Sequence, residues 1–337
     1  MAETSRPEKS RPAKPRVIIT RELADTIHNR MGELFDVVPN LTDHAFTRDD
    51  LITAMANCDV LVPTVTDHID AEMIAGAPER LQLIASFGAG VDHIDLAAAR
   101  ARKILVTNTP GVFTEDTADM TMALILSVPR RLAEGEKLMR SGKWEGWKPS
   151  GMLGHCIGGK KLGIIGMGRI GQAVARRASG FGLSIVYHNR RQLPPAVEES
   201  LNATYVEDLD ELIQTCDIIT IHCPSTPETH ELINAERIAM MKPSTYLINT
   251  ARGDLIDENA LIEALQQEKI SGAGLDVYAQ EPAVDERLLA LKNVVLLPHM
   301  GSATFEGREA SGERVIANIR VWADGHRPPD QVLEGWA

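Results

Sequence analysis

Three side chains able to transfer a proton or bind an anion each follow a predicted strand in the second half of the chain. Arg252, Glu281 and His299 come after apolar runs near 245–250, 270–277 and 293–298. Taken singly, such residues are more often surface or structural groups. Parallel strands, however, bring their carboxyl ends to one edge of a sheet, where ligands bind. The sequence therefore predicts a guanidinium, a carboxylate and an imidazole on one rim.

A glycine-rich turn precedes these residues and predicts a dinucleotide site. The apolar run Leu162–Ile165 leads into Gly166-x-Gly168-x-x-Gly171, and a helical pattern continues to about residue 180. Strand, glycine turn and helix in this order form the context that a dinucleotide fingerprint requires. The first glycine allows a tight turn, the second a close approach of the pyrophosphate, and the third close packing of helix on strand. The free N–H groups at the helix start favour an anion.

The end of the next predicted strand indicates which coenzyme is bound. An NAD site places an acid there for the ribose hydroxyl, whereas this strand ends in His188-Asn189-Arg190-Arg191. A guanidinium is suited to a 2′-phosphate, so Arg190 favours NADP(H), with NAD(H) as the lesser alternative.

Length and composition exclude several classes of protein. A chain of 337 residues is long enough for about two domains, and a net charge of −12 argues against a nucleic-acid or anionic-membrane partner. The four cysteines form no CxxC pair, and metal-site motifs are absent, so we expect no metal and a reduced, cytoplasmic compartment. No apolar run reaches the roughly 18 residues of a membrane span. We expect residues 1–16 to be a disordered tail.

Strands alternate with helices along the whole chain, which predicts α/β domains with parallel sheets. The first series has strands at 17–20, 35–38, 59–63, 81–87 and 103–108, with helices at 22–34, 47–57, 70–77 and 96–102. The second has strands at 161–166, 183–188, 203–206, 217–223, 245–250, 270–277 and 293–298, with helices at 168–180, 208–215, 228–241, 257–268 and 284–291. We therefore expect two Rossmann-like, doubly wound parallel sheets.

A long helix and an irregular segment join the two series. Thr114 is predicted as the N-cap of a helix that reaches about Arg140 and is bent or split by Pro129. Residues 141–159 have little periodicity and contain Trp144 and Trp147, which suits an arm for subunit contact. A final helix near 304–324 follows the second series. Its position predicts that the chain returns to the first domain and that an active-site cleft lies between the domains.

These motifs closely resemble those of the D-isomer-specific 2-hydroxyacid dehydrogenases over nearly the whole chain after the N-terminal tail. In chain order, the matching motifs are Gly88–Asp95, Asn108–Gly111, Ala118-Asp119, Gly166–Gly171, His222–Pro224, Asn249–Gly253, Leu275–Val277 and Pro298–Thr304. The resemblance implies a flavodoxin-like substrate domain of residues 17–110 and 301–337, and a nucleotide-binding Rossmann domain of residues 111–300. It also implies a homodimer, with a dimerisation arm at about 127–158.

The resemblance also assigns roles to the residues. It implies that Arg252 binds the substrate carboxylate, that His299 is the general acid in reduction with Glu281 as its partner, and that the loop of Ala89 and Gly90 binds substrate through its N–H groups. The glycine turn, the strand end and the resemblance together predict coenzyme contacts from Thr117, Gly166, Gly168, Arg169, Ile170, Gly171, Asn189, Arg190, Arg191, Cys223, Pro224, Thr229, Thr250, Ala251, Asp276 and Gly301.

Within the family, His188–Arg191 looks like the NADP-preferring glyoxylate and hydroxypyruvate reductases. We therefore expect a reductase that forms D-2-hydroxy acids from small 2-keto acids. Two alternatives stay open at this point: a broader dehydrogenase acting on phenylpyruvate-like acids, and a non-catalytic nucleotide sensor. The preferred keto acid, the direction in the cell and the strength of the coenzyme preference do not follow from the sequence.

Overall fold

The computed structural model describes residues 14–333, and the chain divides into two compact units. Unit 1 contains the residues up to Pro110 together with those from Arg308 onward, and unit 2 contains Gly111–Gly307. The predicted disordered tail lies, for residues 1–13, outside the described residues. The predicted cleft between domains stays a prediction.

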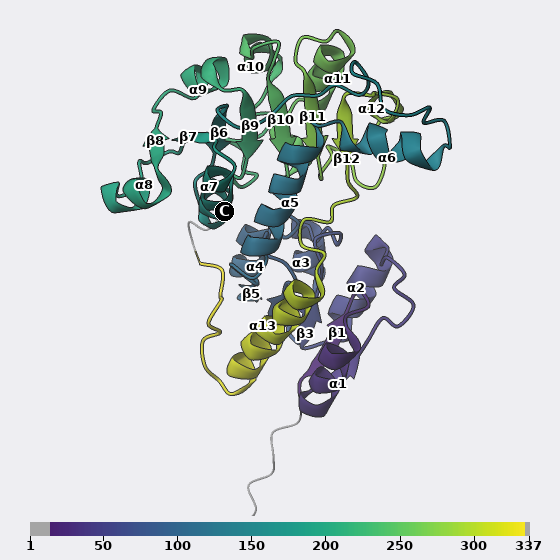
Figure 1. The fold of residues 1–337 in the computed structure, drawn as a ribbon. Coiled ribbons are helices and arrows are strands. Elements are labelled where there is room, and N and C mark those ends of the chain that lie inside the picture. The colour runs from purple at the N-terminus through teal and green to yellow at the C-terminus, as the bar shows by residue number, and fades with distance from the viewer. Residues whose placement is uncertain (1–13, 334–337) are drawn as a thin grey trace, which may run out of the picture. The chain divides into compact units, whose positions relative to one another are not determined.

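Unit 1 is built on a five-stranded parallel sheet with the order β2-β1-β3-β4-β5 (Figure 1). Its strands are β1 (Arg16–Ile19), β2 (Asp36–Val38), β3 (Val60–Val62), β4 (Leu83–Ala85) and β5 (Leu105–Thr107). The residues of β3 and β4 are all buried, as expected for a parallel sheet covered on both faces. Leu61 and Ile84 lie in the core of this unit with Met55 of a neighbouring helix.

Helices connect the strands of unit 1, and a late helix completes it. They are α1 (Asp25–Leu34), α2 (Arg48–Ala56), α3 (Ala71–Gly76), α4 (Leu96–Ala101) and α13 (Phe305–Ala323). Helix α13 packs tightly on α1, because a Cβ at Gly312 would stand 2.5 Å from Cγ1 of Ile27. The segment after α13 then pairs with β5, since Val332 N donates to Val106 O at 2.8 Å.

Unit 2 contains a seven-stranded parallel sheet with the order β12-β11-β10-β9-β6-β7-β8. Its strands are β6 (Lys161–Ile165), β7 (Ser184–His188), β8 (Ala203–Tyr205), β9 (Ile218–Ile221), β10 (Tyr246–Asn249), β11 (Gly272–Leu275) and β12 (Val294–Leu296). The chain winds outward from β6 in both directions, because β6 lies between β7 and β9. Such a switch point opens a ligand site at the carboxyl ends of the strands.

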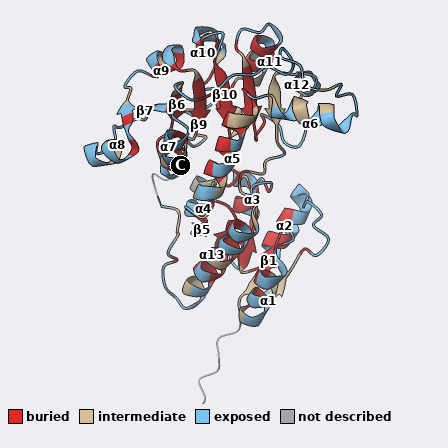
Figure 2. Cartoon of the chain, in the orientation of Figure 1, coloured by how far each residue is buried: buried red, intermediate tan, exposed pale blue. Residues whose placement is uncertain are grey.

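The helices of unit 2 cover both faces of this sheet. They are α5 (Thr114–Ser127), α6 (Leu132–Arg140), α7 (Arg169–Gly180), α8 (Pro195–Leu201), α9 (Leu209–Thr215), α10 (Ala235–Met240), the 3₁₀ turn η1 (Gly253–Leu255), α11 (Glu258–Gln266) and α12 (Glu286–Leu289). One buried cluster contains residues of α5, α7 and α8, and another contains residues of α9, α10 and α11. Figure 2 shows the strands between these layers as buried.

Three features of unit 2 differ from the expectations. Thr114 is not the N-cap but the first helical residue, and no side chain caps α5 at Phe113. Helix α10 is shorter than 228–241, because the Thr229 hydroxyl accepts from Thr226 N at 2.8 Å in a preceding turn and Asn234 caps the helix at its actual start. Helix α8 was not expected. It begins with proline at a position that needs no N–H donor.

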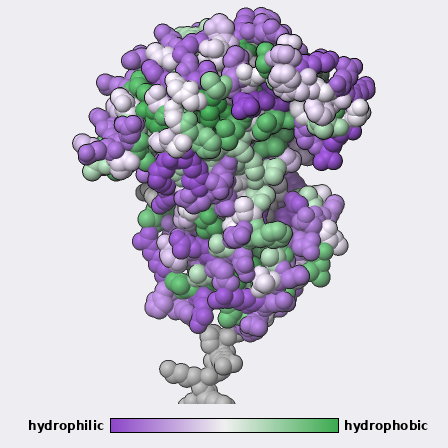
Figure 3. Space-filling model, viewed as in Figure 1, coloured by the Kyte–Doolittle hydropathy of each residue, from purple (hydrophilic) through white to green (hydrophobic). Residues whose placement is uncertain are grey.

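Pro129 separates α5 from α6, as predicted, and Arg131 adopts a left-handed conformation at the junction. Hydrophilic side chains cover much of the face shown in Figure 3, in keeping with the high net charge. Among the described helices, none combines the length and the apolar character needed to cross a membrane.

Candidate active site

Glu281 and His299 form a hydrogen-bonded pair at the carboxyl end of the sheet in unit 2. His299 Nδ1 lies 2.7 Å from Glu281 Oε2, and the other carboxylate oxygen accepts from Tyr278 N at 3.1 Å. Burial would raise the pKa of Glu281, but the His299 bond and charge, the Tyr278 N–H and the Arg252 charge together hold it below its usual value. The Glu281 carboxylate is therefore ionised at neutral pH.

Asp276 holds the backbone that carries the histidine. Its buried carboxylate accepts from the N–H of Met300 and of Gly301, both at 2.7 Å. Burial raises the pKa of Asp276, and these two N–H groups oppose that rise. His299 itself has a φ of 51°, which costs a non-glycine residue roughly 1–2 kcal/mol. The two bonds that follow it offset this cost and fix the direction of the imidazole.

Arg252 lies in a loop whose backbone is held by the side chain of Asn249. The amide of Asn249 donates to Arg252 O at 2.7 Å and accepts from Ala251 N at 3.0 Å. Gly253 brings this loop against the next one, because a Cβ at that position would stand 1.9 Å from the carbonyl carbon of Tyr278. The loop of Arg252 therefore packs against the segment of Tyr278, and the Arg252 charge is one of the influences that lower the pKa of Glu281.

The glycine turn after β6 has the geometry predicted for a dinucleotide site. Gly166 has a φ of 98°, and a Cβ there would stand 2.5 Å from Cys223 N. A Cβ at Gly171 would stand 2.4 Å from Gly166 O, so the third glycine lets α7 approach the strand. Gly168 has open space around it, and the first intrahelical bond is Gln172 N to Gly168 O. The N–H groups before Gln172 therefore face outward at the helix start.

The loop after β7 carries the predicted coenzyme selectors. Asn189 accepts from Met167 N in the glycine turn at 2.7 Å, which joins the two loops. Arg190 and Arg191 are exposed on the same loop. The Arg190 charge also reaches Glu228, whose pKa is lowered mainly by the Thr226 hydroxyl and in smaller part by this arginine.

The other predicted coenzyme residues fall into two groups. Thr250 Oγ1 lies 2.8 Å from Thr121 Oγ1, and a Cβ at Gly301 would lie 3.7 Å from Cγ2 of Thr117 and 2.9 Å from Asp276 Oδ2. These residues, with Ala251, gather at the ends of β10 and β11. The second group stands by the glycine turn: Cys223 contacts Gly166, and the Thr229 hydroxyl donates to Pro224 O at 2.8 Å. Arg169 and Ile170 begin α7 at that turn.

Known proteins resemble this chain in sequence and in fold. The family model of the D-isomer specific 2-hydroxyacid dehydrogenase, NAD binding domain, matches residues 122–301. A glyoxylate reductase from Thermococcus litoralis is 45% identical over 323 residues, which are 95% of this chain and 97% of that relative.

The chain belongs to the D-isomer specific 2-hydroxyacid dehydrogenase family.

Two solved structures extend the similarity to this dehydrogenase's fold. A glyoxylate reductase from Paecilomyes thermophila has a TM-score of 0.85 and 32% identity, covering 96% of this chain and 99% of that one. An NADPH-dependent glyoxylate/hydroxypyruvate reductase from Sinorhizobium meliloti, in complex with NADP and malonate, has a TM-score of 0.83 and 34% identity. The alignment covers 96% of this chain and 98% of the chain from Sinorhizobium meliloti.

The dehydrogenase's residues fit the nicotinamide coenzyme of the family. The glycine turn leaves space at Gly168 and presents unbonded N–H groups at the start of α7, which is what a pyrophosphate needs. Asn189, in place of an acid, follows β7. A bound reduced nicotinamide supplies a hydride to a carbonyl carbon.

Several supporting residues escaped the sequence analysis. The Tyr187 hydroxyl accepts from Leu193 N at 2.8 Å and donates to Glu198 at 2.7 Å, so it fixes the loop of Arg190. Burial and the Glu198 bond raise the pKa of Tyr187 to about 12. Tyr278 donates to Leu297 O at 2.8 Å and supports the strand before His299. Only the placement of tyrosines at strand ends could have indicated these contacts.

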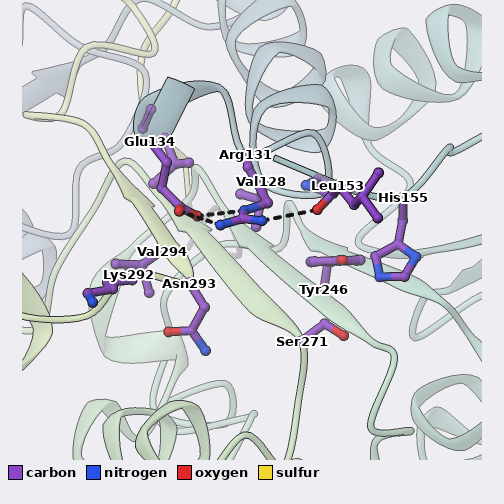
Figure 4. Close-up of a pocket in the computed structure, with 14 residues that line it drawn as sticks. Val128, Arg131, Glu134, Leu153, His155, Tyr246, Ser271, Lys292, Asn293 and Val294 are labelled. Carbon is purple, nitrogen blue, oxygen red and sulfur yellow. Dashed lines mark hydrogen bonds and ion pairs between the residues drawn. The ribbon is translucent and has the colours of Figure 1, made fainter. Parts of the chain in front are cut away.

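The hollow drawn in Figure 4 lies at the amino ends of the strands of the same sheet. It has a volume of about 310 Å³ and is lined by residues at the amino ends of the strands, including Tyr246, Ser271 and Asn293. Arg131 crosses it and bonds both Glu134 and Leu153 O. The catalytic candidates follow the carboxyl ends, so this hollow is separate from the active site of the dehydrogenase.

A second histidine, His222, follows β9 near the glycine turn. His222 Nε2 lies 2.9 Å from the Thr220 hydroxyl, and burial lowers the pKa of His222 to about 3, so this ring is neutral. Within residues 14–333, no group of His, Cys, Asp and Glu is arranged to hold a metal ion.

Proposed function

We propose that this dehydrogenase reduces small 2-keto acids, glyoxylate and hydroxypyruvate first, to D-2-hydroxy acids. The observation that carries the proposal is the Glu281–His299 pair at 2.7 Å, with Arg252 beside it, on the rim of a dinucleotide-binding sheet. The curated relative from Thermococcus litoralis is a glyoxylate reductase, and its similarity extends over nearly the whole chain.

Each rim residue has a chemical role in this proposal. The Arg252 guanidinium pairs with the substrate carboxylate through two N–H donors and thereby sets the carbonyl direction. Negative charge develops on the carbonyl oxygen during reduction, and the His299 imidazolium donates its proton there through Nε2. Glu281 is hydrogen-bonded to Nδ1 and thereby fixes the orientation of the ring. In oxidation the same imidazole accepts the proton.

The coenzyme is proposed to be NADP(H) in preference to NAD(H). Arg190 and Arg191 are exposed where the 2′-phosphate of NADP would lie, and no carboxylate follows β7 to bind a free ribose hydroxyl. The remaining coenzyme contacts are assigned to the residues around the glycine turn and to those at the ends of β10 and β11.

A homodimer is part of the proposal. Leu132, Trp147 and Leu153 are 52%, 83% and 65% exposed, and all three lie in the predicted arm at 127–158. Large apolar and aromatic side chains on one exposed segment are typical of a protein interface. Light scattering should give twice the mass of the chain, and Trp147→Asp should shift the protein toward the monomer. A wild-type monomer would refute the dimer.

We also propose a cytoplasmic location, because Cys58, Cys156, Cys216 and Cys223 are all free thiols, as in reducing compartments.

The testing experiment is steady-state oxidation of NADPH and of NADH with glyoxylate, hydroxypyruvate and phenylpyruvate. We expect fast turnover of the two small acids with NADPH. His299→Ala should lower kcat by about 10²- to 10⁴-fold while NADPH binding, followed by its fluorescence, is kept. Preference for phenylpyruvate would indicate the broader dehydrogenase, and NADPH binding without turnover of any acid would indicate a nucleotide sensor.

A further inference from the structure

The loop after β4 in unit 1 is anchored through two successive carbonyl groups. Gly88 O accepts from Thr109 N at 2.9 Å, and Ala89 O accepts from the side-chain amide of Asn108 at 2.6 Å. Both donors belong to the segment that follows β5, the neighbour of β4 in the sheet. Ser86 precedes this loop and His93 follows it. Ser86 Oγ lies 3.3 Å from His93 Nε2, so the two ends of the loop are also linked.

Anchoring these carbonyls also fixes the direction of two N–H groups. In a trans peptide the C=O and the N–H of one amide plane point in opposite directions. The amide that contributes Ala89 O also contributes the Gly90 N–H, and the one that contributes Gly88 O contributes the Ala89 N–H. Both N–H groups therefore point away from Asn108 and Thr109. Neither donates to any residue of the described chain.

Asn108 is itself held by a buried network. Its N–H donates to Asp330 O at 3.3 Å, and its carbonyl accepts from the Asn318 amide at 3.3 Å. Asn318 is fully buried, and its oxygen accepts from Asp330 N at 3.0 Å. The Arg314 guanidinium lies 2.9 Å from the Asp330 carboxylate. These bonds hold the backbone of Asn108, from which its buried side chain reaches the Ala89 carbonyl.

We propose that Asn108 is a positioning residue for substrate binding. Its amide locks the Ala89–Gly90 peptide plane so that the N–H groups of Ala89 and Gly90 form a preorganised site for the substrate carboxylate. Two adjacent N–H groups in a loop form a concave anion site of a known type. The inference rests on the proposed function, because it concerns the binding of the same 2-keto acid.

The side-chain amide is essential to this role, because only a donor can hold a carbonyl. Asn108→Asp keeps the shape but replaces the donor by a carboxylate, which repels Ala89 O and frees the peptide plane to rotate. A hydrogen bond to a charged group corresponds to about a 10- to 100-fold change in affinity, and we expect KM for glyoxylate to rise by that factor. The KM for NADPH should change less than about twofold.

The same unit offers a matched control. Asn40 is 8% exposed, against 7% for Asn108, and its amide also donates to backbone carbonyls, Thr20 O at 2.8 Å and His44 O at 2.6 Å. It follows β2, at the opposite edge of the sheet from β5. Asn40→Asp should therefore cost stability to a similar degree and leave KM for glyoxylate unchanged.

The experiment measures kcat, both KM values and the thermal midpoint for wild type, Asn108→Asp and Asn40→Asp. Asn108→Ala and Asn40→Ala form a second pair, which removes the donor without adding repulsion. Titration of oxalate, a planar dicarboxylate, into each protein with NADPH bound gives carboxylate affinity independently of turnover. A rise in glyoxylate KM and oxalate Kd confined to the Asn108 variants supports the proposal.

Three results would overturn it: unchanged glyoxylate KM in the Asn108 variants, an equal rise in the Asn40 variants, or failure of both Asn108 variants to fold while the Asn40 variants fold. The last result would mean that Asn108 serves stability alone. Failure of the proposed function gives a different result, because wild type itself would then turn over no keto acid.

Discussion

His299 Nδ1 lies 2.7 Å from Glu281 Oε2, although the two residues follow different strands of the sheet. The pairing occupies Nδ1, and the proposed function assigns the other ring nitrogen to the substrate. The left-handed backbone of His299, clamped by Asp276, fixes the ring from the other side. Acid, partner and backbone clamp thus form one unit, which makes the contribution of each separable by substitution.

Removing the charge of Glu281 while keeping the shape of its side chain should lower the catalytic rate more than the stability of the fold. In Glu281→Gln the contact with His299 survives, but the protonated imidazole loses its counter-charge. We expect kcat for glyoxylate reduction to fall by about 100-fold, with the free energy of unfolding nearly unchanged. Steady-state kinetics and urea unfolding measure the two quantities. A kcat equal to that of the wild type would show that the charge of Glu281 does not assist the reaction.

Arg190 should determine the coenzyme preference, and Glu228 should weaken it. Removing the guanidinium in Arg190→Ala removes a charge-assisted contact, so KM for NADPH should rise about 10- to 100-fold while KM for NADH changes little. Glu228 carries a negative charge that offsets part of the Arg190 charge. Glu228→Gln removes that negative charge and should therefore lower KM for NADPH. Arg176→Ala, on an exposed helix position of the same unit, is the control. Equal effects on both coenzymes would refute the assignment.

Gly253 should tolerate no side chain. A Cβ there would stand 1.9 Å from Tyr278 C, so Gly253→Ala must push apart the loops of Arg252 and Glu281. We expect a loss of more than about 2 kcal/mol in the free energy of unfolding, together with lost activity. Gly32→Ala, where a Cβ meets nothing within 4 Å inside α1, should instead stabilise by up to about 1 kcal/mol. Urea unfolding of both variants compares the two sites.

Asp217 should contribute stability that depends on pH. Burial opposes its ionisation, but the Lys161 N–H at 2.9 Å and the Lys242 ammonium at 2.8 Å bring its pKa below the ordinary 3.8. A lowered folded-state pKa stabilises the protein above the unfolded-state value, and that stability is lost as the pH falls through the folded-state value.

Asp217→Asn should therefore cost about 1 kcal/mol at pH 7, and progressively less as the pH falls through the folded-state pKa of Asp217. Urea unfolding at several pH values, with Asp49→Asn on exposed α2 as the control, measures the difference. A cost that is the same at all pH values would point to packing, not to charge.

The sequence predicted the elements that repeat a simple pattern and missed those fixed by long-range contact. The alternation of apolar runs and helices placed every strand of both sheets, because buried parallel strands are continuous apolar runs. The positions of the glycine turn and of the three rim residues near strand ends were also predicted, since each lies within a few residues of the end of an apolar run. Tyr187, Tyr278 and Asn108 were not predicted to support a loop, because their partners lie on other loops. Helix α8 was missed because Pro194, before the helix, and Pro195, its first residue, are typical of a break.

The return of the chain to unit 1 has a consequence for synthesis. Unit 2 is one continuous stretch, whereas unit 1 needs α13 and the segment that pairs with β5, which the ribosome makes after unit 2. At about 5–20 residues per second, the roughly 200 residues of unit 2 take on the order of 10–40 s to appear. During that time Ile27 and the edge of β5 are without the partners that later cover them. The first third of the nascent chain, up to Pro110, is therefore the part that a cell must keep from aggregating.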